Sequence, residues 1–297
     1  MQISSAFIAN IQDIYKEAGL TWLKHLPALL DRLCQKRGLR FLTAMPTLTY
    51  NFVGLVEVMA TKETAIIKMA PTNEYVIKEA KWLERFHEGV AKVFWIDEEH
   101  HAFLMEHLIP GKPLKTLVSS DDDQATRIIC QTIRTIHAQK VETKGYKHLS
   151  ELAHSFVALE GRVETSLLSQ AKAWFADLTQ DKSQDVLLHG DLHHDNILSS
   201  NTQWKAIDPH GYVGDPAFEV GPMIYNPGDC FPHEKDMTVI IERRLKILTE
   251  ELRFDAKRIK AWTFCMSMLS IAWTVEDHGD VPAFELMVAN IIDKVKI

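Results

Sequence analysis

Two carboxylates and one amide lie close together in the second half of the 297-residue chain, at Asp191, Asn196 and Asp208. The apolar run 186–188 predicts a short buried strand that leads into a polar loop, and residues 197–207 predict two short strands joined by a polar turn. An antiparallel hairpin of this kind places Asn196, where its first strand begins, beside Asp208, where its second strand ends. Oxygen ligands of these types suit Mg²⁺ better than zinc, so the pattern predicts a magnesium site.

The sequence HGDLHHDN at residues 189–196 has the spacing of a kinase catalytic loop. In such a loop, His-x-Asp is followed after four residues by Asn, and a metal-binding Asp comes after a short hairpin. Phosphoryl transfer depends mostly on positioning and charge neutralisation. Asp191 would therefore orient a substrate hydroxyl and accept its proton, while Asn196 and Asp208 would hold Mg²⁺ across the phosphates of ATP.

The histidines of this loop offer an alternative interpretation. His189 and His193 have the H-x-x-x-H spacing of some metal sites, but that spacing converges on a metal only in a helix. The stretch is predicted to be a loop between strands, so the kinase interpretation is favoured.

A second part of such a site is predicted upstream. Lys68 lies in the strand-like run 64–70, the expected place of a lysine that pairs the α- and β-phosphates. The helix predicted over residues 74–87 would supply its carboxylate partner. The three candidates are Glu74, Glu79 and Glu84. We favour Glu79, because apolar residues flank it on the inner face, and we expect it to form an ion pair with Lys68.

The glycine-rich phosphate loop of protein kinases has no counterpart here. Gly54 is the only glycine in residues 46–58, so the loop at about 49–52 must use other residues. The segment 102–111 is the predicted connector, whose backbone at Glu106 and Leu108 would hydrogen-bond adenine. The alternative for that segment is an ordinary strand and turn.

The elements that must position these residues fall into two groups. Strands are predicted over residues 39–45, 50–59, 64–70, 90–96 and 102–107, with one helix over 74–87. After Pro110 and Gly111 the pattern becomes mainly helical. Helices are predicted over 123–139, where Asp121 to Asp123 offer caps, over 151–180, and from about 234 onward.

The predicted fold class is therefore α+β, a bilobal protein-kinase-like fold. A small β-rich nucleotide-binding lobe would span residues 1–108, and a larger, mainly helical lobe for catalysis and substrate binding would span 109–297. Residues 1–38 form a helical leader, with one helix over 5–18 that Gly19 ends and another from Pro27 to Arg37. An apolar stripe at helical spacing usually packs on a core, although a membrane-surface helix is an alternative for this leader.

The composition narrows the possible partners. The chain is 46% hydrophobic and 25% charged with a net charge of -7, and no basic patch stands out, which argues against nucleic-acid binding. The four cysteines form no metal or disulfide pattern and are expected to be free thiols. No signal peptide and no 18-residue apolar run is found, so we expect a cytoplasmic protein without membrane contact. Nothing indicates an obligate protein partner.

Three longer runs resemble a known family. They are HGDLHHDNIL at 189–198, IDP at 207–209 and GDPAFEVGPMIYNP at 214–227, and they are similar to the aminoglycoside phosphotransferase superfamily, especially its streptomycin 6-phosphotransferase and hydroxyurea-kinase branch. The likeness includes residues 270–277 and spans about 48–290, which leaves the leader unmatched. Gly190 stands where many protein kinases carry an Arg that pairs with a phosphorylated loop, so we expect no such switch.

The resemblance implies a small-molecule alcohol as substrate, a cationic aminocyclitol such as streptomycin. Acidic side chains could receive its guanidinium or ammonium groups, and an indole could stack on a cation or sugar ring. The candidates are Asp215, Glu219, Glu276 and Asp277 for the acids and Trp273 for the indole. Each has a structural alternative, namely a helix cap at Asp215, a solvated helix end at 276–277 and a core position for Trp273.

Other functions stay open at this point. The substrate could be another small alcohol, of hydroxyurea, choline, homoserine or sugar type, because one fold serves many substrates. A non-catalytic nucleotide-binding pseudokinase is disfavoured, since Lys68, Asp191, Asn196 and Asp208 are all present. A protein kinase is disfavoured, because the short stretch from Asp208 to the helical tail leaves little room for an activation segment and a peptide platform. A metal-dependent hydrolase is disfavoured, because it would not need Lys68.

Overall fold

The computed structural model describes residues 3–46, 48–72, 75–231 and 234–296. It is an α+β protein that divides into two compact units, Met1–Gly111 and Lys112–Ile297. That these units bind nucleotide and substrate respectively stays a prediction. Within the described ranges, no helix combines the length and the apolar character needed to cross a membrane.

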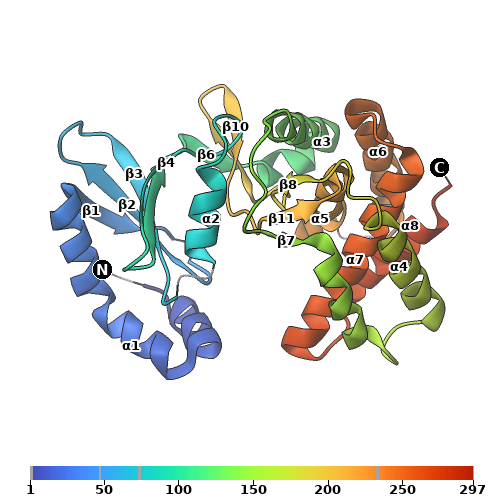
Figure 1. Ribbon diagram of the computed structural model, residues 1–297, viewed down its shortest axis with the longest axis horizontal. Coiled ribbons are helices and arrows are strands. Elements are labelled where there is room, and N and C mark those ends of the chain that lie inside the picture. The colour runs from blue at the N-terminus through green and yellow to red at the C-terminus, as the bar shows by residue number, and fades with distance from the viewer. Residues whose placement is uncertain (1–2, 47, 73–74, 232–233, 297) are drawn as a thin grey trace. The chain divides into compact units, whose positions relative to one another are not determined.

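The first unit is built on one antiparallel sheet of five strands in the order β1-β2-β3-β5-β4 (Figure 1). The strands are β1 (Leu39–Ala44), β2 (Phe52–Val58), β3 (Thr64–Met69), β4 (Val93–Asp97) and β5 (Ala102–Glu106). Side chains alternate between the two faces of a strand. In β3 this alternation directs Ala65, Ile67 and Met69 into an apolar core, and it directs Lys68 to the other face.

Helix α1 (Ser5–Arg37) covers the apolar face of this sheet (Figure 1). Its buried side chains Phe7, Ile11, Leu26, Leu30 and Leu33 pack into one core cluster with the strands. The apolar stripe of the leader therefore serves the core of the first unit, which removes the reason to consider a membrane-surface helix.

The break in α1 differs from the prediction. The chain bends at Lys16, whose φ is 51°, and Gly19 lies inside the following helical segment. Gly19 is needed for close packing rather than for ending a helix, because a Cβ there would lie 2.6 Å from the carbonyl oxygen of Ile11. Pro27 also lies inside the helix rather than near its start.

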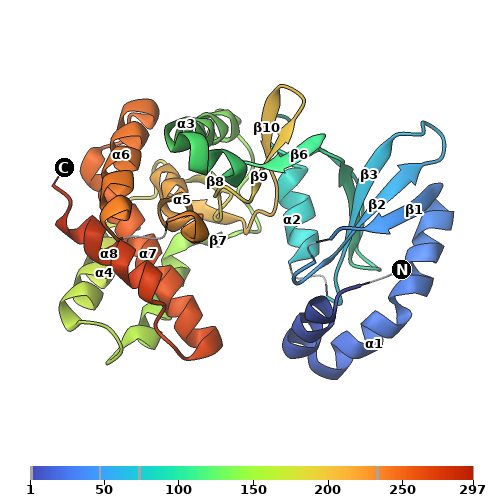
Figure 2. The same ribbon diagram turned by 180° about the vertical axis from the view of Figure 1, so that it is seen from behind.

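The second unit is mainly helical, as predicted, and α7 lies at its centre, in contact with α4, α5 and α8 (Figure 2). Its helices are α3 (Lys115–His137), α4 (Thr165–Leu178), α5 (Gly221–Tyr225), α6 (Glu234–Leu252), α7 (Ala256–His278) and α8 (Ala283–Lys294). Three 3₁₀ helices add to them, η1 (Leu149–Leu159), η2 (Pro216–Val220) and η3 (Gly228–Cys230). Trp262 and Phe264 of α7 are fully buried among other aromatic rings.

Two helix predictions need correction. The predicted helix 123–139 begins earlier, at Lys115, and bends at Asp121, whose side chain accepts a hydrogen bond from Gln124 N at 2.9 Å. Asp121 thus caps the main part of the helix as expected. The predicted helix 151–180 is instead η1 followed by α4, because the chain turns at Gly161, whose φ is 71°.

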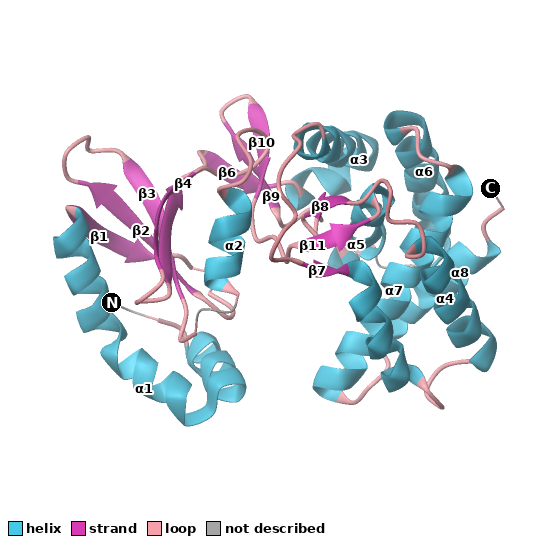
Figure 3. Ribbon diagram, viewed as in Figure 1, coloured by secondary structure: helices cyan, strands magenta, loops and turns pink. Residues whose placement is uncertain are grey.

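Short strands surround the polar loop 189–196 in the second unit (Figure 3). The predicted hairpin is present as β9 (Ile197–Ser200) and β10 (Gln203–Ala206), with Ile197 opposite Ala206. β8 (Val186–Leu188) leads into the loop and pairs with β11 (Tyr212–Gly214), which also pairs with β7 (Lys147–His148). Lys112 of β6 (Pro110–Pro113) donates its N–H to Ser199 Oγ at 2.9 Å. β6, β7 and β11 were not predicted, since strands this short have no period of their own.

A buried arginine joins three segments of this unit. Arg244 of α6 is fully buried and donates to Asp122 of α3, with Nη2 at 2.6 Å from Oδ1. Its Nη1 donates to the carbonyls of Met223 and Asn226, each at 2.7 Å. The guanidinium group therefore fixes the chain after α5 against α3 and α6.

Replacing Arg244 with Met should lower the free energy of unfolding by about 3–5 kcal/mol, because two carbonyls lose their donor and the buried Asp122 carboxylate keeps only its longer contact with Arg243 at 3.4 Å among the described residues. Chemical denaturation measures this. The matched control is Arg243→Met at the preceding residue, whose side chain is 42% exposed and pairs with the exposed Asp123, and at 3.4 Å with Asp122. That change should cost less than about 1 kcal/mol. Equal effects of the two variants would contradict the assignment.

Candidate active site

The loop that follows β8 is fixed first by His189, which is fully buried. Its Nε2 lies 2.8 Å from the carbonyl oxygen of Ile207, and its Nδ1 accepts from Asp191 N at 3.3 Å. Because a carbonyl only accepts, the ring proton sits on Nε2 and the imidazole is neutral. Burial lowers the pKa of His189, in agreement with that state. His189 thereby connects the loop to the residue before Asp208.

Glu219 of η2 fixes the same loop through hydrogen bonds to its backbone. Its carboxylate is fully buried and accepts from His189 N at 3.1 Å and from Gly190 N at 2.9 Å. Burial pushes the pKa of Glu219 up, but the neighbouring His137, His189 and the Gly190 N–H outweigh it and bring the pKa below its ordinary value. The carboxylate is therefore ionised at neutral pH and acts on the loop backbone.

Gly190 can hold its place only without a side chain. Its φ is 84°, in the left-handed region, and a Cβ would lie 2.7 Å from the ring of Tyr212. An arginine of the protein-kinase type would not fit at this position. The departure from that pattern has a steric cause in the β8–β11 packing.

Asn196 and Asp191 meet at the end of the loop. Asn196 Nδ2 donates to the backbone oxygen of Asp191 at 2.9 Å and to its Oδ2 at 3.0 Å. Both partners are acceptors, so the amide nitrogen faces Asp191 and the amide oxygen faces away from it. That oxygen is the ligand type predicted for Mg²⁺.

Two histidines flank the Asp191 carboxylate, which is 25% exposed. His193 Nε2 lies 3.5 Å and His210 Nε2 3.8 Å from Oδ2. His193 Nδ1 accepts from Asp195 N at 3.3 Å, which leaves the proton of a neutral ring on Nε2. Burial raises the pKa of Asp191, but its hydrogen bond with His193 and the nearby histidines outweigh this and lower it. Asp191 is thus an ionised acceptor at neutral pH.

Asp208 follows β10 and has an unusual backbone, with φ at 59°. The preceding Ile207 N donates to the carbonyl of Asn196 at 2.9 Å, so Asp208 and Asn196 are neighbours across the hairpin end. Burial lowers the pKa of His193, but Asp191, Asp195 and Asp208 outweigh this and raise it, which places the Asp208 charge close to the loop. A carboxylate and an amide oxygen suit a hard cation, so these residues fit Mg²⁺.

In the first unit, Lys68 and Glu79 form the expected ion pair. Lys68 Nζ lies 2.7 Å from Glu79 Oε2, and both side chains are less than a tenth exposed. Glu79 comes from α2 (Val76–Leu83), which lies on the face of the sheet opposite α1. Of the other candidates, Glu84 is exposed at the end of α2, and Glu74 lies outside the described residues.

The predicted adenine-binding backbone lies at and just after the end of β5. Glu106 pairs with Ala65 of β3, and its N–H donates to the carbonyl of Lys92 at 2.8 Å. Glu106 could therefore offer adenine only its carbonyl, and the donor would have to come from Leu108, whose side chain is buried. These two contacts stay predictions.

Two acids that were expected to bind substrate instead form hydrogen bonds within the protein. Asp215 is only 6% exposed, caps η2 through Ala217 N at 3.0 Å, and accepts from Arg258 Nε at 2.6 Å and from the Trp262 indole. Glu219 is engaged with the loop backbone. These contacts argue against the substrate role expected for both, and the structural alternative for Asp215, a helix cap, is the one found.

The other substrate candidates lie on α7. The indole of Trp273 is half-buried and donates to Ser155 Oγ at 3.2 Å. Glu276 and Asp277 are exposed near the end of that helix. No hydrogen bond or ion pair connects these three with the loop 189–196 in the described part of the chain, so their role stays a prediction.

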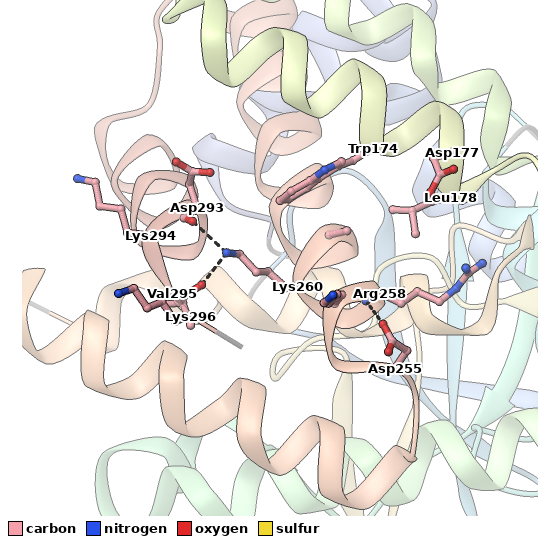
Figure 4. A pocket seen from close by; sticks show the side chains of 12 residues that line it. Trp174, Asp177, Leu178, Asp255, Arg258, Lys260, Asp293, Lys294, Val295 and Lys296 are labelled. Carbon is pink, nitrogen blue, oxygen red and sulfur yellow. Dashed lines mark hydrogen bonds between the residues drawn. The ribbon is translucent and has the colours of Figure 1, made fainter.

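A cavity of about 620 Å³ opens elsewhere in the second unit, between α4 and the adjoining ends of α7 and α8 (Figure 4). Trp174, Arg258 and Lys260 line it, and Lys260 Nζ is held by the carbonyls of Asp293 and Val295 at 2.9 and 2.6 Å. None of the residues with a predicted role lines this cavity. Cavity size is therefore a poor guide to the chemistry here.

Several residues near the loop were not predicted from sequence. His193 and His210 gave no signal as neighbours of Asp191, and His137 lies 3.8 Å from Glu219 across a long stretch of chain. Burial, Asp191 and Glu285 raise the pKa of Tyr225, while a hydrogen bond with Ser270 lowers it. The hydrogen bond with Ser270 joins Tyr225 to α7.

A five-stranded antiparallel sheet with a buried Lys68–Glu79 pair, followed by a mainly helical unit with the loop HGDLHHDN, is typical of a kinase-like phosphotransferase. Residues 49–278 match the family model described as aminoglycoside/hydroxyurea antibiotic resistance kinase, and the chain belongs to that family.

Known relatives agree with this assignment. The chain is 26% identical to streptomycin 6-kinase of Streptomyces griseus over 88% of its own length and 87% of the relative. It is 30% identical to streptomycin 3''-kinase of Klebsiella pneumoniae over 72% and 80% of the two chains. Among solved structures, aminoglycoside phosphotransferase APH(4)-Ia superposes with a TM-score of 0.65 at 13% identity, covering 91% of this chain and all of that one, which supports the shared fold.

Glu219→Gln should weaken the catalytic loop. Glutamine offers one oxygen to two backbone N–H groups and turns its NH₂ toward one of them, so the free energy of unfolding should fall by about 1–3 kcal/mol. Turnover should fall by about tenfold to a hundredfold, because the loop loses its exact placement. Denaturation and a phosphoryl-transfer assay measure both, with Glu242→Gln at an exposed position of α6 as control. Unchanged stability together with unchanged turnover would contradict the positioning role.

The stability of the protein should fall in mild acid through His194. This side chain is fully buried, and neither ring nitrogen has a hydrogen-bond partner among the described residues. Burial, with Arg244 and His193 adding to it, holds the pKa of His194 well below its ordinary value. Below about pH 6.5 the unfolded chain takes up a proton that the folded chain does not, so the free energy of unfolding falls.

His194→Leu should flatten this dependence. Uptake of one proton by the unfolded chain lowers the free energy of unfolding by up to about 1.4 kcal/mol per pH unit. This contribution should be absent from the variant between about pH 6 and 5. At pH 7.5 its stability should be close to that of the wild type, since no hydrogen bond to a described residue is lost. Denaturation across this pH range makes the measurement, with His278→Leu at an exposed site as control. An unaltered slope in His194→Leu would refute the assignment.

Proposed function

We propose that this protein transfers the γ-phosphoryl group of ATP to a hydroxyl of a cationic, aminoglycoside-like small molecule. The observation that carries the proposal is the Asp191–Asn196 contact at 2.9 and 3.0 Å. It keeps an ionised carboxylate free to accept a hydroxyl proton on one side. On the other it turns the amide oxygen of Asn196 away from Asp191, while the backbone of Asn196 is joined to Ile207, the neighbour of Asp208.

Each residue then has a distinct task. Asp191 accepts a hydrogen bond from the substrate hydroxyl and orients its oxygen for in-line attack on the γ-phosphorus. Its lowered pKa suits a proton transfer that occurs late, as expected for a loose transition state. Asn196 Oδ1 and Asp208 would hold Mg²⁺, which when bound neutralises charge on the phosphates. Lys68, held by Glu79, would contact the α- and β-phosphates.

The substrate class is supported by the relatives and by local charge. The two relatives described above are named for streptomycin and for different positions on it, so the modified hydroxyl stays open. Since Asp215 and Glu219 are occupied, we assign cation recognition to other acids. Glu285, in the first turn of α8, influences Tyr225 together with Asp191 and is the favoured candidate. Carboxylates suit guanidinium and ammonium groups.

A smaller acceptor is the second candidate. The family description includes hydroxyurea, whose hydroxyl needs the same Asp191 and the same metal ligands. Alcohols of choline, homoserine or sugar type would need them as well. The presence of Lys68, Asp191, Asn196 and Asp208 disfavours a non-catalytic nucleotide-binding module.

The test is ADP release from ATP and Mg²⁺ across streptomycin, other aminoglycosides, hydroxyurea and simple amino alcohols. Asp191→Asn should lower turnover of the accepted substrate by about 10²–10⁴-fold, because the general base is lost. Binding of ATP should be little changed. Asp195→Asn on the same loop is the matched control, since that carboxylate is 38% exposed and pairs with Lys115.

Three results would bear on the proposal. Near-normal turnover by Asp191→Asn would show that another group is the base. Turnover of hydroxyurea alone would favour the second candidate. Asp208→Ala should abolish Mg²⁺-dependent nucleotide binding, and nucleotide binding that stays Mg²⁺-dependent in this variant would exclude Asp208 as a metal ligand.

A further inference from the structure

The loop between β1 and β2 contains no glycine, and α1 contacts its residues Leu48 and Thr49. Asn10 Nδ2 donates to the carbonyl oxygen of Thr49 at 3.1 Å. Leu48 is only 8% exposed and belongs to the same core cluster as Phe7 and Ile11 of α1. One hydrogen bond and one apolar anchor thus connect the first segment of α1 with adjacent loop residues.

The bend at Lys16 brings that segment into position. In a straight helix, Ile11 and Gly19 would stand about 12 Å apart along the axis. Here a Cβ on Gly19 would lie 2.6 Å from Ile11 O and 2.9 Å from Tyr15 Cβ. The chain therefore reverses at Lys16, and the segment before it returns along the one after it. Figure 1 shows the first turns of α1 set at an angle to the rest of the helix.

A glycine-rich phosphate loop can adapt its backbone to the nucleotide, because glycine reaches conformations that other residues avoid. The β1–β2 loop of this chain lacks that freedom. A loop without glycine must already hold the binding conformation, since ordering it on binding would weaken the affinity. The structure supplies an external support for it in α1.

We propose that the first segment of α1 pre-organises the β1–β2 loop for the phosphates of the nucleotide, with Asn10 as a positioning residue and Gly19 as the packing point that sets the bend. The inference rests on the proposed ATP-dependent function. It assigns a task to the leader, which lies outside the matched residues 49–278. Asn10 acts through Thr49 and contacts no substrate.

The experiment compares wild type, Asn10→Ala and Gly19→Ala with Gln12→Ala, a control at an exposed position of the same segment. Calorimetry gives the affinity for Mg·ATP, and hydrogen exchange of residues 48–52 without nucleotide reports the loop itself. Asn10→Ala should weaken binding by about three- to tenfold, raise KM for ATP with kcat within about twofold, and speed exchange in the loop. Gly19→Ala should do the same, and Gln12→Ala should not.

The possible results separate this inference from the function it rests on. If the wild type binds Mg·ATP and Asn10→Ala binds it equally with unchanged loop exchange, the positioning role is wrong while the kinase function stands. Equal weakening by Gln12→Ala would also overturn it, because the effect would not be specific to the Thr49 contact. A wild type that binds no Mg·ATP would overturn both.

Discussion

The Glu219 carboxylate is the constraint on which the catalytic loop depends. A fully buried charge is costly unless hydrogen bonds satisfy it, and here two consecutive backbone N–H groups do so. The contact fixes His189 and Gly190 together, and His189 then fixes both Asp191 N and the carbonyl before Asp208. One carboxylate thus sets the spacing between the proposed base and a proposed metal ligand. Lys68 and Glu79 of the first unit are a second example of buried charges that are stabilised by their partners, since the ion pair fixes the position of both side chains.

Local patterns allowed much of the structure to be predicted. The hairpin 197–206, the five strands of the first sheet and the Lys68–Glu79 pair depend on alternation and on helix spacing within short windows. The roles of Glu219, His137 and Arg244 depend on contacts between residues far apart in the chain, and no local window contains that information. The bend at Lys16 was not predicted from the sequence for another reason. A glycine a few residues later looked like a helix end, whereas it marks a close approach to Ile11.

The acids of the 214–227 run illustrate how a motif and a substrate site can be confused. Asp215 and Glu219 follow Asp208, the proposed metal ligand, closely, and free acids there would suit a cationic substrate. The structure uses both to hold the protein together, one as a cap joined to Arg258 and one as the anchor of the loop. Residues that fix the phosphoryl-transfer machinery therefore carry little information about the acceptor. The acceptor must be selected by groups outside the motif.

This separation has a consequence for how substrate specificity can change. The loop and its Glu219 anchor form one hydrogen-bonded unit, so altering any member should disturb the proposed reaction. Glu285, by contrast, stands at the start of α8, and after burial and Asp191 its charge is a further cause of the raised pKa of Tyr225. On the proposed function, a change at Glu285 should alter which cation is accepted without breaking a hydrogen bond of the loop 189–196. Kinases that share this loop can therefore differ in acceptor and in the hydroxyl they modify, because the loop fixes the reaction and the surrounding surface fixes the substrate.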